Sequence, residues 1–227
     1  MCGRYTLTYR QAEELAFELG IPVEQLTEYE PHYNIAPNQR QWIVRTEFED
    51  REALKARWGL INHWAKDKNQ GFKQINARAE TVHQRPAFRD AFKKRRCVVP
   101  ADGFYEWQGP RGKRMPLWFH RPDDGLLFFA GLYESWQPEP DVWEPTYTII
   151  TTEANDLISR VHDRMPVILP LDRVDDWLYP KESDRDKLRS FLVPAADDLL
   201  IGTLASPRVN SVKNDDPSLL EYAAEAD

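Results

Sequence analysis

Residues 97–107 read Cys97-Val98-Val99-Pro100-Ala101-Asp102-Gly103-Phe104-Tyr105-Glu106-Trp107. The β-branched Val98 and Val99, and the aromatic side chains at 104, 105 and 107, are typical of two strands that follow one another closely. Further apolar runs, each of which predicts another strand, come at 117–119, 126–133 and 147–151. Many strands at such short spacing favour a largely antiparallel sheet.

The rest of the chain adds strands and a few helices to this pattern. Strands are expected at 4–8, 42–46 and 53–58. Helices are expected at 11–19, 77–84, 86–94 and 153–161, and around 177–178 and 188–192. The first helix has the clearest pattern, because Leu15, Ala16 and Leu19 share one face and Gly20 follows as a stop signal. We therefore expect an α+β fold in which a single domain spans residues 1–227.

The composition is that of a globular protein, with 41% hydrophobic and 30% charged residues among 227. The two cysteines, Cys2 and Cys97, are too few for a disulfide framework, which favours an intracellular, cytoplasmic protein. The longest apolar run, at 126–133, is too short to span a membrane, so we expect no membrane association. The net charge of −7 argues against a surface that coats nucleic acid throughout, but it leaves room for a local basic groove.

The chain begins Met1-Cys2-Gly3-Arg4-Tyr5. An initiator methionine before so small a residue is normally removed, and its removal would leave Cys2 with an α-amine and a thiol on adjacent carbons. An α-amine has a pKa of about 7.7–8.0, so a useful fraction is unprotonated at neutral pH. Such a pair condenses with an aldehyde to a thiazolidine ring. A cysteine at this position is equally consistent with a small buried hydrophobic residue.

Basic residues concentrate in the segment 73–96, where eight of them stand against two acidic residues: Lys73, Arg78, Arg85, Arg89, Lys93, Lys94, Arg95 and Arg96 against Glu80 and Asp90. Aromatic residues flank the segment on both sides: Trp58, Trp64, Phe72, Tyr105 and Trp107. Cations that meet phosphates and rings that stack on bases suit single-stranded nucleic acid. A solvated helix face is the simpler interpretation of the same charges.

Six short segments stand out together, at 1–5, 33–37, 75–81, 101–107, 161–166 and 209–212. In this order they resemble the SOS response-associated peptidase (SRAP) family of abasic-site processing proteins, from residue 2 to about residue 214. The resemblance implies a barrel-like β core flanked by helices. It also implies a monomer that binds single-stranded DNA carrying abasic sites and that, in a bacterium, is associated with the nucleoid. In the family, the N-terminal cysteine forms a stable thiazolidine with the opened sugar and shields the lesion.

Carried over by motif, the resemblance implies catalytic functions for Cys2, Asn76, Glu106 and His162. It implies DNA-binding functions for Arg4, Asn34, Pro37, Trp64, Arg78 and Arg164. Partial burial of Glu106 would raise its pKa and let it move protons near neutrality. His162 would hold a proton at the sugar ring oxygen, and Asn76 would orient the amine or the sugar hydroxyls. Without the family, each of these three side chains is as readily explained as a structural one.

The sequence departs from the family where Asn62 follows Trp58-Gly59-Leu60-Ile61 in place of the usual proline, which affects the loop that carries Trp64. Neither a CxxC pair, a HExxH segment nor a glycine-rich phosphate loop is present, so we expect no metal and no cofactor. The family's peptidase label is linked to removal of the residue before the cysteine. Two alternatives stay open: a cysteine or N-terminal-nucleophile peptidase with His162 as its base, and a non-catalytic single-strand-binding module.

Overall fold

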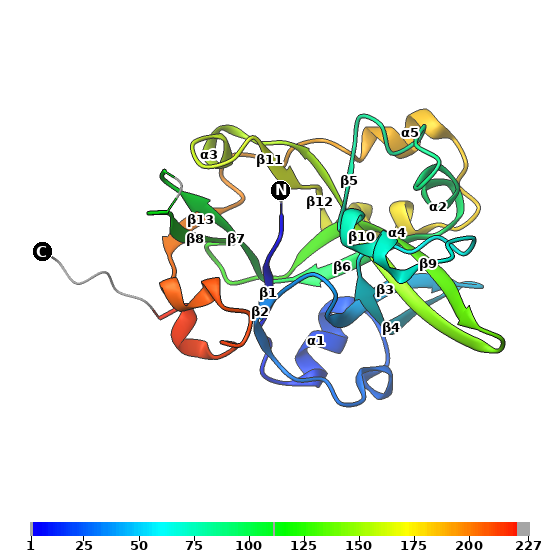
Figure 1. Cartoon of the computed structure of the whole chain (residues 1–227), viewed down its shortest axis with the longest axis horizontal. Helices are drawn as coiled ribbons and strands as arrows, with labels where there is room; N and C mark the ends of the chain where they lie inside the picture. The colour runs from blue at the N-terminus through cyan, green and yellow to red at the C-terminus, as the bar shows by residue number, and fades with distance from the viewer. Residues whose placement is uncertain (1, 111, 222–227) are drawn as a thin grey trace, which may run out of the picture.

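A closed five-stranded barrel forms the centre of the computed structural model, which describes residues 2–110 and 112–221 (Figure 1). Its strands are β3 (Arg40–Glu47), β4 (Asp50–Trp58), β6 (Arg96–Ala101), β9 (Leu127–Glu139) and β10 (Val142–Glu153). The ring closes because β9 pairs with both β6 and β10, while β10 returns to β4. Only the β4–β10 pairing in this ring is parallel; the others are antiparallel.

Three short strands extend the barrel sheet: β5 (Asn76–Arg78) and β11 (Arg164–Pro166) pair with β10, and β12 (Ile168–Leu169) pairs with β9. A second, antiparallel sheet has the order β13-β8-β7-β1-β2. Its strands span Ile201–Leu204, Met115–His120, Gly103–Gln108, Tyr5–Leu7 and His32–Ile35 respectively. Strands β6 and β7 are separated only by Asp102, so the two sheets are joined where the sequence is richest in β-formers.

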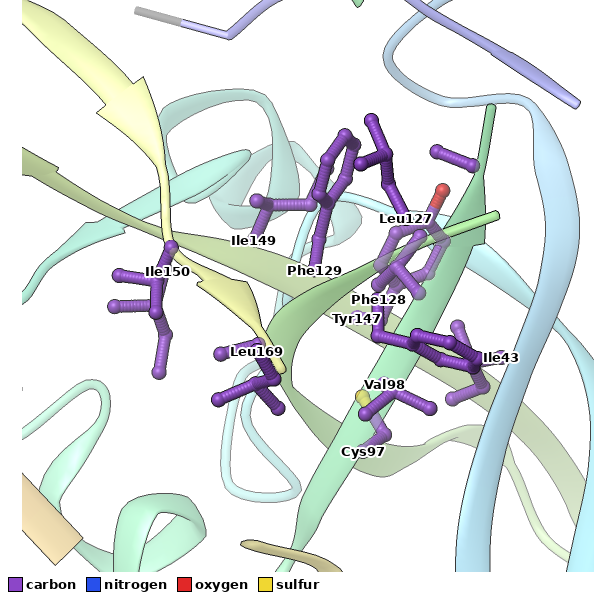
Figure 2. Packing of buried hydrophobic residues seen from close by; sticks show 14 of the residues in the cluster. Ile43, Cys97, Val98, Leu127, Phe128, Phe129, Tyr147, Ile149, Ile150 and Leu169 are labelled. Atoms are coloured by element: carbon purple, nitrogen blue, oxygen red, sulfur yellow. The ribbon is translucent and has the colours of Figure 1, made fainter. Parts of the chain in front are cut away.

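The barrel interior is filled with apolar side chains from every strand. Ile43, Cys97, Phe129, Tyr147 and Ile149 are among those that pack there, each with 1% or less of its surface exposed (Figure 2). Burial of this kind contributes about 25 cal/mol for each Å² of apolar surface removed from water. The barrel is therefore the rigid support on which the second sheet and the loops are mounted.

Short helices lie around the two sheets. They are α1 (Ala12–Leu19), α2 (Arg89–Lys94), α3 (Asp156–Ser159), α4 (Val174–Leu178) and α5 (Arg185–Ser190). The 3₁₀ turns are η1 (Val23–Leu26), η2 (Lys68–Lys73), η3 (Leu171–Arg173), η4 (Pro207–Asn210) and η5 (Pro217–Leu219). Helix α1 buries the predicted face and ends at Gly20, whose φ of 65° is the left-handed conformation that glycine adopts without strain. No helix in the described part of the chain is long and apolar enough to cross a membrane.

The predicted α+β class with a barrel-like, largely antiparallel core is confirmed, but two predicted helices are wrong. Residues 77–84 do not form a helix: the first two continue β5, where Ala77 is buried opposite Ile150, and turns follow. The helix expected at 153–161 shrinks to α3, because Glu153 still pairs in β10. In both places, pairing with a distant strand outweighs local helix propensity.

Candidate active site

Cys2 is buried just ahead of β1, with no exposed surface. The antiparallel pairing of Tyr5 with Phe104 continues through the bond from the Tyr105 amide to the Arg4 carbonyl oxygen (3.0 Å). The N-terminal segment therefore runs beside β7. In Figure 1 it leads from β1 toward the side of the molecule that carries β5, β11 and α3.

This placement sets the state of the Cys2 thiol. Burial raises its pKa, and the nearby Glu106 carboxylate raises it further. The thiol is therefore protonated at neutral pH and needs a base when it reacts.

Glu106 is the second titratable group of the site. It sits in β7 between Tyr105 and Trp107, with 4% of its surface exposed. Burial raises the pKa of Glu106 to about 7, and the Asp163 carboxylate adds to the rise while Arg114 opposes it. A carboxyl with this pKa can both give and accept a proton near neutrality.

His162 lies in the loop between α3 and β11. Its Nδ1 accepts a hydrogen bond from the Arg164 amide (2.9 Å), which places the proton of the neutral ring on Nε2. The Asp163 carboxylate lies 3.0 Å from the same Nδ1 and would accept from it only in the protonated ring. Burial lowers the pKa of His162, with Asp163 acting against that shift, so the neutral ring with Nε2–H is favoured.

Asn76 opens β5, where it pairs with Ile149 of the barrel. Its Nδ2 donates to the Ile75 carbonyl oxygen (3.0 Å). Its Oδ1 is buried and accepts no hydrogen bond from the described residues. A buried acceptor without a partner costs free energy, so this oxygen is suited to a donor group on a bound substrate.

Two groups that sequence reasoning did not single out belong to the same site. Asp163 and Arg114 both act on Glu106 and on His162, which places Glu106 of β7 and His162 of the α3–β11 loop in one electrostatic environment. Asp163 was within reach of prediction, since it lies inside the segment 161–166. Arg114, directly before β8, carries no motif that would have marked it.

The residues expected to bind DNA fall into two groups, and their DNA contacts stay predictions. Arg78, at the end of β5, is exposed and forms no ion pair with the described residues. Trp64 is 55% exposed and borders a surface hollow with Lys66 and Lys73. Pro37 is half-buried in the turn after β2.

The other three already have protein partners. Arg4 donates to Asn34 Oδ1 (2.9 Å), and Asn34 is 1% exposed. Arg164 forms a bidentate pair with Glu80 (2.6 and 3.0 Å) and donates to the Thr151 carbonyl oxygen (2.5 Å). For these three side chains, contact with DNA would have to be added to existing bonds or replace them.

The described residues contain no group of three or more histidine, cysteine, aspartate or glutamate side chains that could hold a metal ion. Cys2 and Cys97 are both free and buried.

The model of the SOS response associated peptidase (SRAP) family matches residues 1–212. The chain belongs to this family. It is 42% identical to the abasic site processing protein YoaM of Bacillus subtilis, over 97% of this chain and 98% of that protein. It is 31% identical to the abasic site processing protein HMCES of Gallus gallus, over 85% of this chain and 66% of that protein. A crystal structure from Bacteroides thetaiotaomicron matches with a TM-score of 0.86 at 25% identity, covering 98% of this chain and all of the other.

The raised pKa of Glu106 predicts how stability changes with pH. A carboxyl whose pKa is higher in the folded than in the unfolded state binds its proton more tightly in the folded state. The free energy of unfolding therefore falls as the pH rises from about 4.5 to about 7. The shift corresponds to about 3 kcal/mol, and Glu106→Gln removes it. As the pH rises over this range, the free energy of unfolding of the variant should therefore increase relative to that of the parent by this amount, as measured by urea unfolding.

The control for this comparison is Glu49→Gln, a change at an exposed carboxylate in the β3–β4 turn. The difference in free energy of unfolding between this variant and the parent should stay constant over the same pH range. Parallel curves for the parent and Glu106→Gln would show that Glu106 is not protonated near neutrality.

Proposed function

We propose that this SRAP protein captures abasic sites in single-stranded DNA as a covalent thiazolidine on Cys2, after Met1 has been removed. The observation that carries the proposal is the burial of Cys2 beside Glu106, a carboxyl whose pKa is about 7. The names of the relatives, abasic site processing proteins, support the same substrate. The aldehyde of the opened abasic sugar is the group that a 1,2-aminothiol captures.

The first step uses the α-amine of Cys2. Its lone pair attacks the aldehyde carbon, and proton transfers turn the product into a carbinolamine. Loss of one water then gives an imine. Glu106 in its protonated form supplies the proton to the departing oxygen. The neutral His162 donates from Nε2 toward the sugar ring oxygen, which favours the open aldehyde over the closed ring.

The second step uses the thiol. The sulfur adds to the carbon of the protonated imine, its proton passes to the carboxylate left by the first step, and the C=N electron pair becomes the lone pair of the ring amine. Aldehyde and aminothiol thus give thiazolidine and one water, and Glu106 returns to its starting state. Asn76 Oδ1 accepts from a sugar hydroxyl or from the Cys2 amine, which orients the reactants.

The raised pKa of the Cys2 thiol separates this proposal from an ordinary cysteine peptidase. Such an enzyme needs a thiolate, whose pKa is lowered by a cationic partner. Here burial and a neighbouring carboxylate act in the opposite direction. The peptidase activity that we include is restricted to the N-terminus: hydrolysis of the Met1–Cys2 peptide bond, which consumes one water and frees the α-amine.

For the DNA itself, we propose contacts on the exposed side chains near the site. Arg78 meets a phosphate, and Trp64 stacks on a base with Pro37 beside the lesion. Arg4 and Arg164 add positive charge to the same surface. Single strands fit this arrangement better than duplex, because their bases are free to stack on a ring.

An uncleavable extension ahead of Cys2 tests the mechanism directly. It keeps the thiol but converts the α-amine into an amide without a basic lone pair. We expect this variant to bind abasic DNA and to yield no band that survives a denaturing gel. Cys2→Ser and Cys2→Ala keep the amine and should give only an imine, which is lost unless borohydride traps it. Crosslinking of the extended protein at the rate of the trimmed one would show that the amine is dispensable.

A second prediction concerns the DNA surface. Arg78→Ala should weaken binding of intact and abasic strands alike, and the dependence of log K on log salt should become shallower by about 0.7 for the lost phosphate contact. Fluorescence anisotropy at several salt concentrations measures both quantities. The control is Arg189→Ala, on α5 and outside the proposed contacts. An unchanged affinity and salt slope for Arg78→Ala would remove this residue from the DNA surface.

A further inference from the structure

Residues 205–219, which we call the C-terminal strap, form a braced loop against the second sheet. The Ser206 amide donates to the Leu219 carbonyl oxygen (2.9 Å) and joins the two ends of the strap. Arg208 and Asp216 form an ion pair inside it (2.9 Å). Val209 and Leu219 are fully buried and pack with Tyr105 of β7. The strap therefore keeps its own shape and packs against the strand that carries Glu106.

Asn34 of β2 connects this strap to the N-terminal segment. Its Nδ2 donates to the carbonyl oxygens of Val209 (3.2 Å), Ser211 (3.0 Å) and Asn214 (2.7 Å). Its Oδ1 accepts from Arg4 Nη1, which also donates to Val209 O (2.8 Å). One buried amide thus holds three strap carbonyls and the guanidinium that lies two residues after Cys2.

Asn210 makes the corresponding connection to β7. Its Oδ1 accepts from Trp107 Nε1 (2.8 Å), while the Tyr105 hydroxyl donates to the Tyr33 carbonyl oxygen (2.7 Å). Both neighbours of Glu106 are therefore held from the strap side of the sheet. Successive side chains of a strand point to opposite faces, so Glu106 is directed away from the strap and toward the site.

We propose that the strap positions the reacting groups of the crosslinking reaction, with Asn34 and Asn210 as its positioning residues. Asn34 acts through Arg4 on the segment that begins with the reactive cysteine. Asn210 acts through Trp107 on the strand that carries the reactive carboxyl. The inference rests on the proposed function. It adds that the rate of ring formation depends on two side chains whose hydrogen bonds run only to the protein. A misplacement of about 1 Å between reacting groups costs roughly 100-fold in rate, so loosening either connection slows the chemistry.

Asn210→Leu tests the connection to β7, since leucine has a similar size and cannot accept from Trp107. We expect the crosslinking rate at saturating abasic oligonucleotide to fall about 10- to 100-fold. The Kd for an intact strand should stay within about twofold of the parent. Asn210→Asp keeps the acceptor and should restore most of the rate. A merely structural contact would not produce this separation of rate from affinity, nor its rescue by aspartate.

Asn34→Asp tests the connection to the N-terminal segment. It keeps an acceptor for Arg4 but turns an oxygen toward the three strap carbonyls. The same fall in rate is expected at a saturating concentration of abasic oligonucleotide, at a temperature well below the thermal unfolding midpoint of the variant. If this variant does not fold, Asn210→Leu decides the inference alone.

Arg208→Met is the matched control, because it removes only an exposed ion pair, which adds little to the stability of the strap, and leaves both connections in place. It should crosslink at the parental rate. The inference is overturned if Asn210→Leu keeps the parental rate, if rate and affinity fall together in Asn210→Leu, or if Arg208→Met is equally slow. Absence of a crosslink in the parent protein would instead overturn the proposed function.

Discussion

The pairing of β1 with β7 is the constraint on which the rest of the structure depends. It holds the segment that begins with Cys2 alongside the strand that carries Glu106. Asp102, between β6 and β7, secures this pairing: its carboxylate accepts from Thr6 Oγ1 (2.5 Å), Thr8 Oγ1 (2.7 Å) and the Thr8 amide. Because β6 belongs to the barrel, the closed ring also fixes the position of the segment that begins with Cys2.

Burial then determines the chemistry of both groups. The surroundings that raise the pKa of the Cys2 thiol also raise the pKa of Glu106 into the neutral range. A protonated thiol is a poor nucleophile, so in the proposed reaction the α-amine reacts first and the thiol follows once a base is available. The order of the two proposed steps therefore follows from the burial of the Cys2 thiol and of Glu106. Neither step starts from a thiolate or uses a metal ion.

Local patterns in the sequence were enough for most strands and for α1, because alternating or one-sided apolar residues report which face of an element is buried. They failed at 77–84, where the deciding interaction is the pairing of Ala77 with Ile150, far along the chain. The site residues came from motif resemblance, and local patterns gave no partners for them. The four hydrogen bonds of Asn34 and the bidentate pair of Arg164 with Glu80 join residues that lie far apart in the chain, so local sequence patterns could not predict them.

The most direct test of the account is the number of free thiols in the crosslinked protein. The chain has two cysteines, so the denatured free protein takes up two carbamidomethyl groups from iodoacetamide. After reaction with abasic oligonucleotide and treatment with borohydride, a thiazolidine leaves Cys97 as the one cysteine that can be alkylated. Peptide mass spectrometry should therefore find Cys2 joined to the sugar and unmodified by iodoacetamide. An alkylated Cys2 on the DNA-linked peptide would show that the sulfur never closed the ring, and would contradict the account.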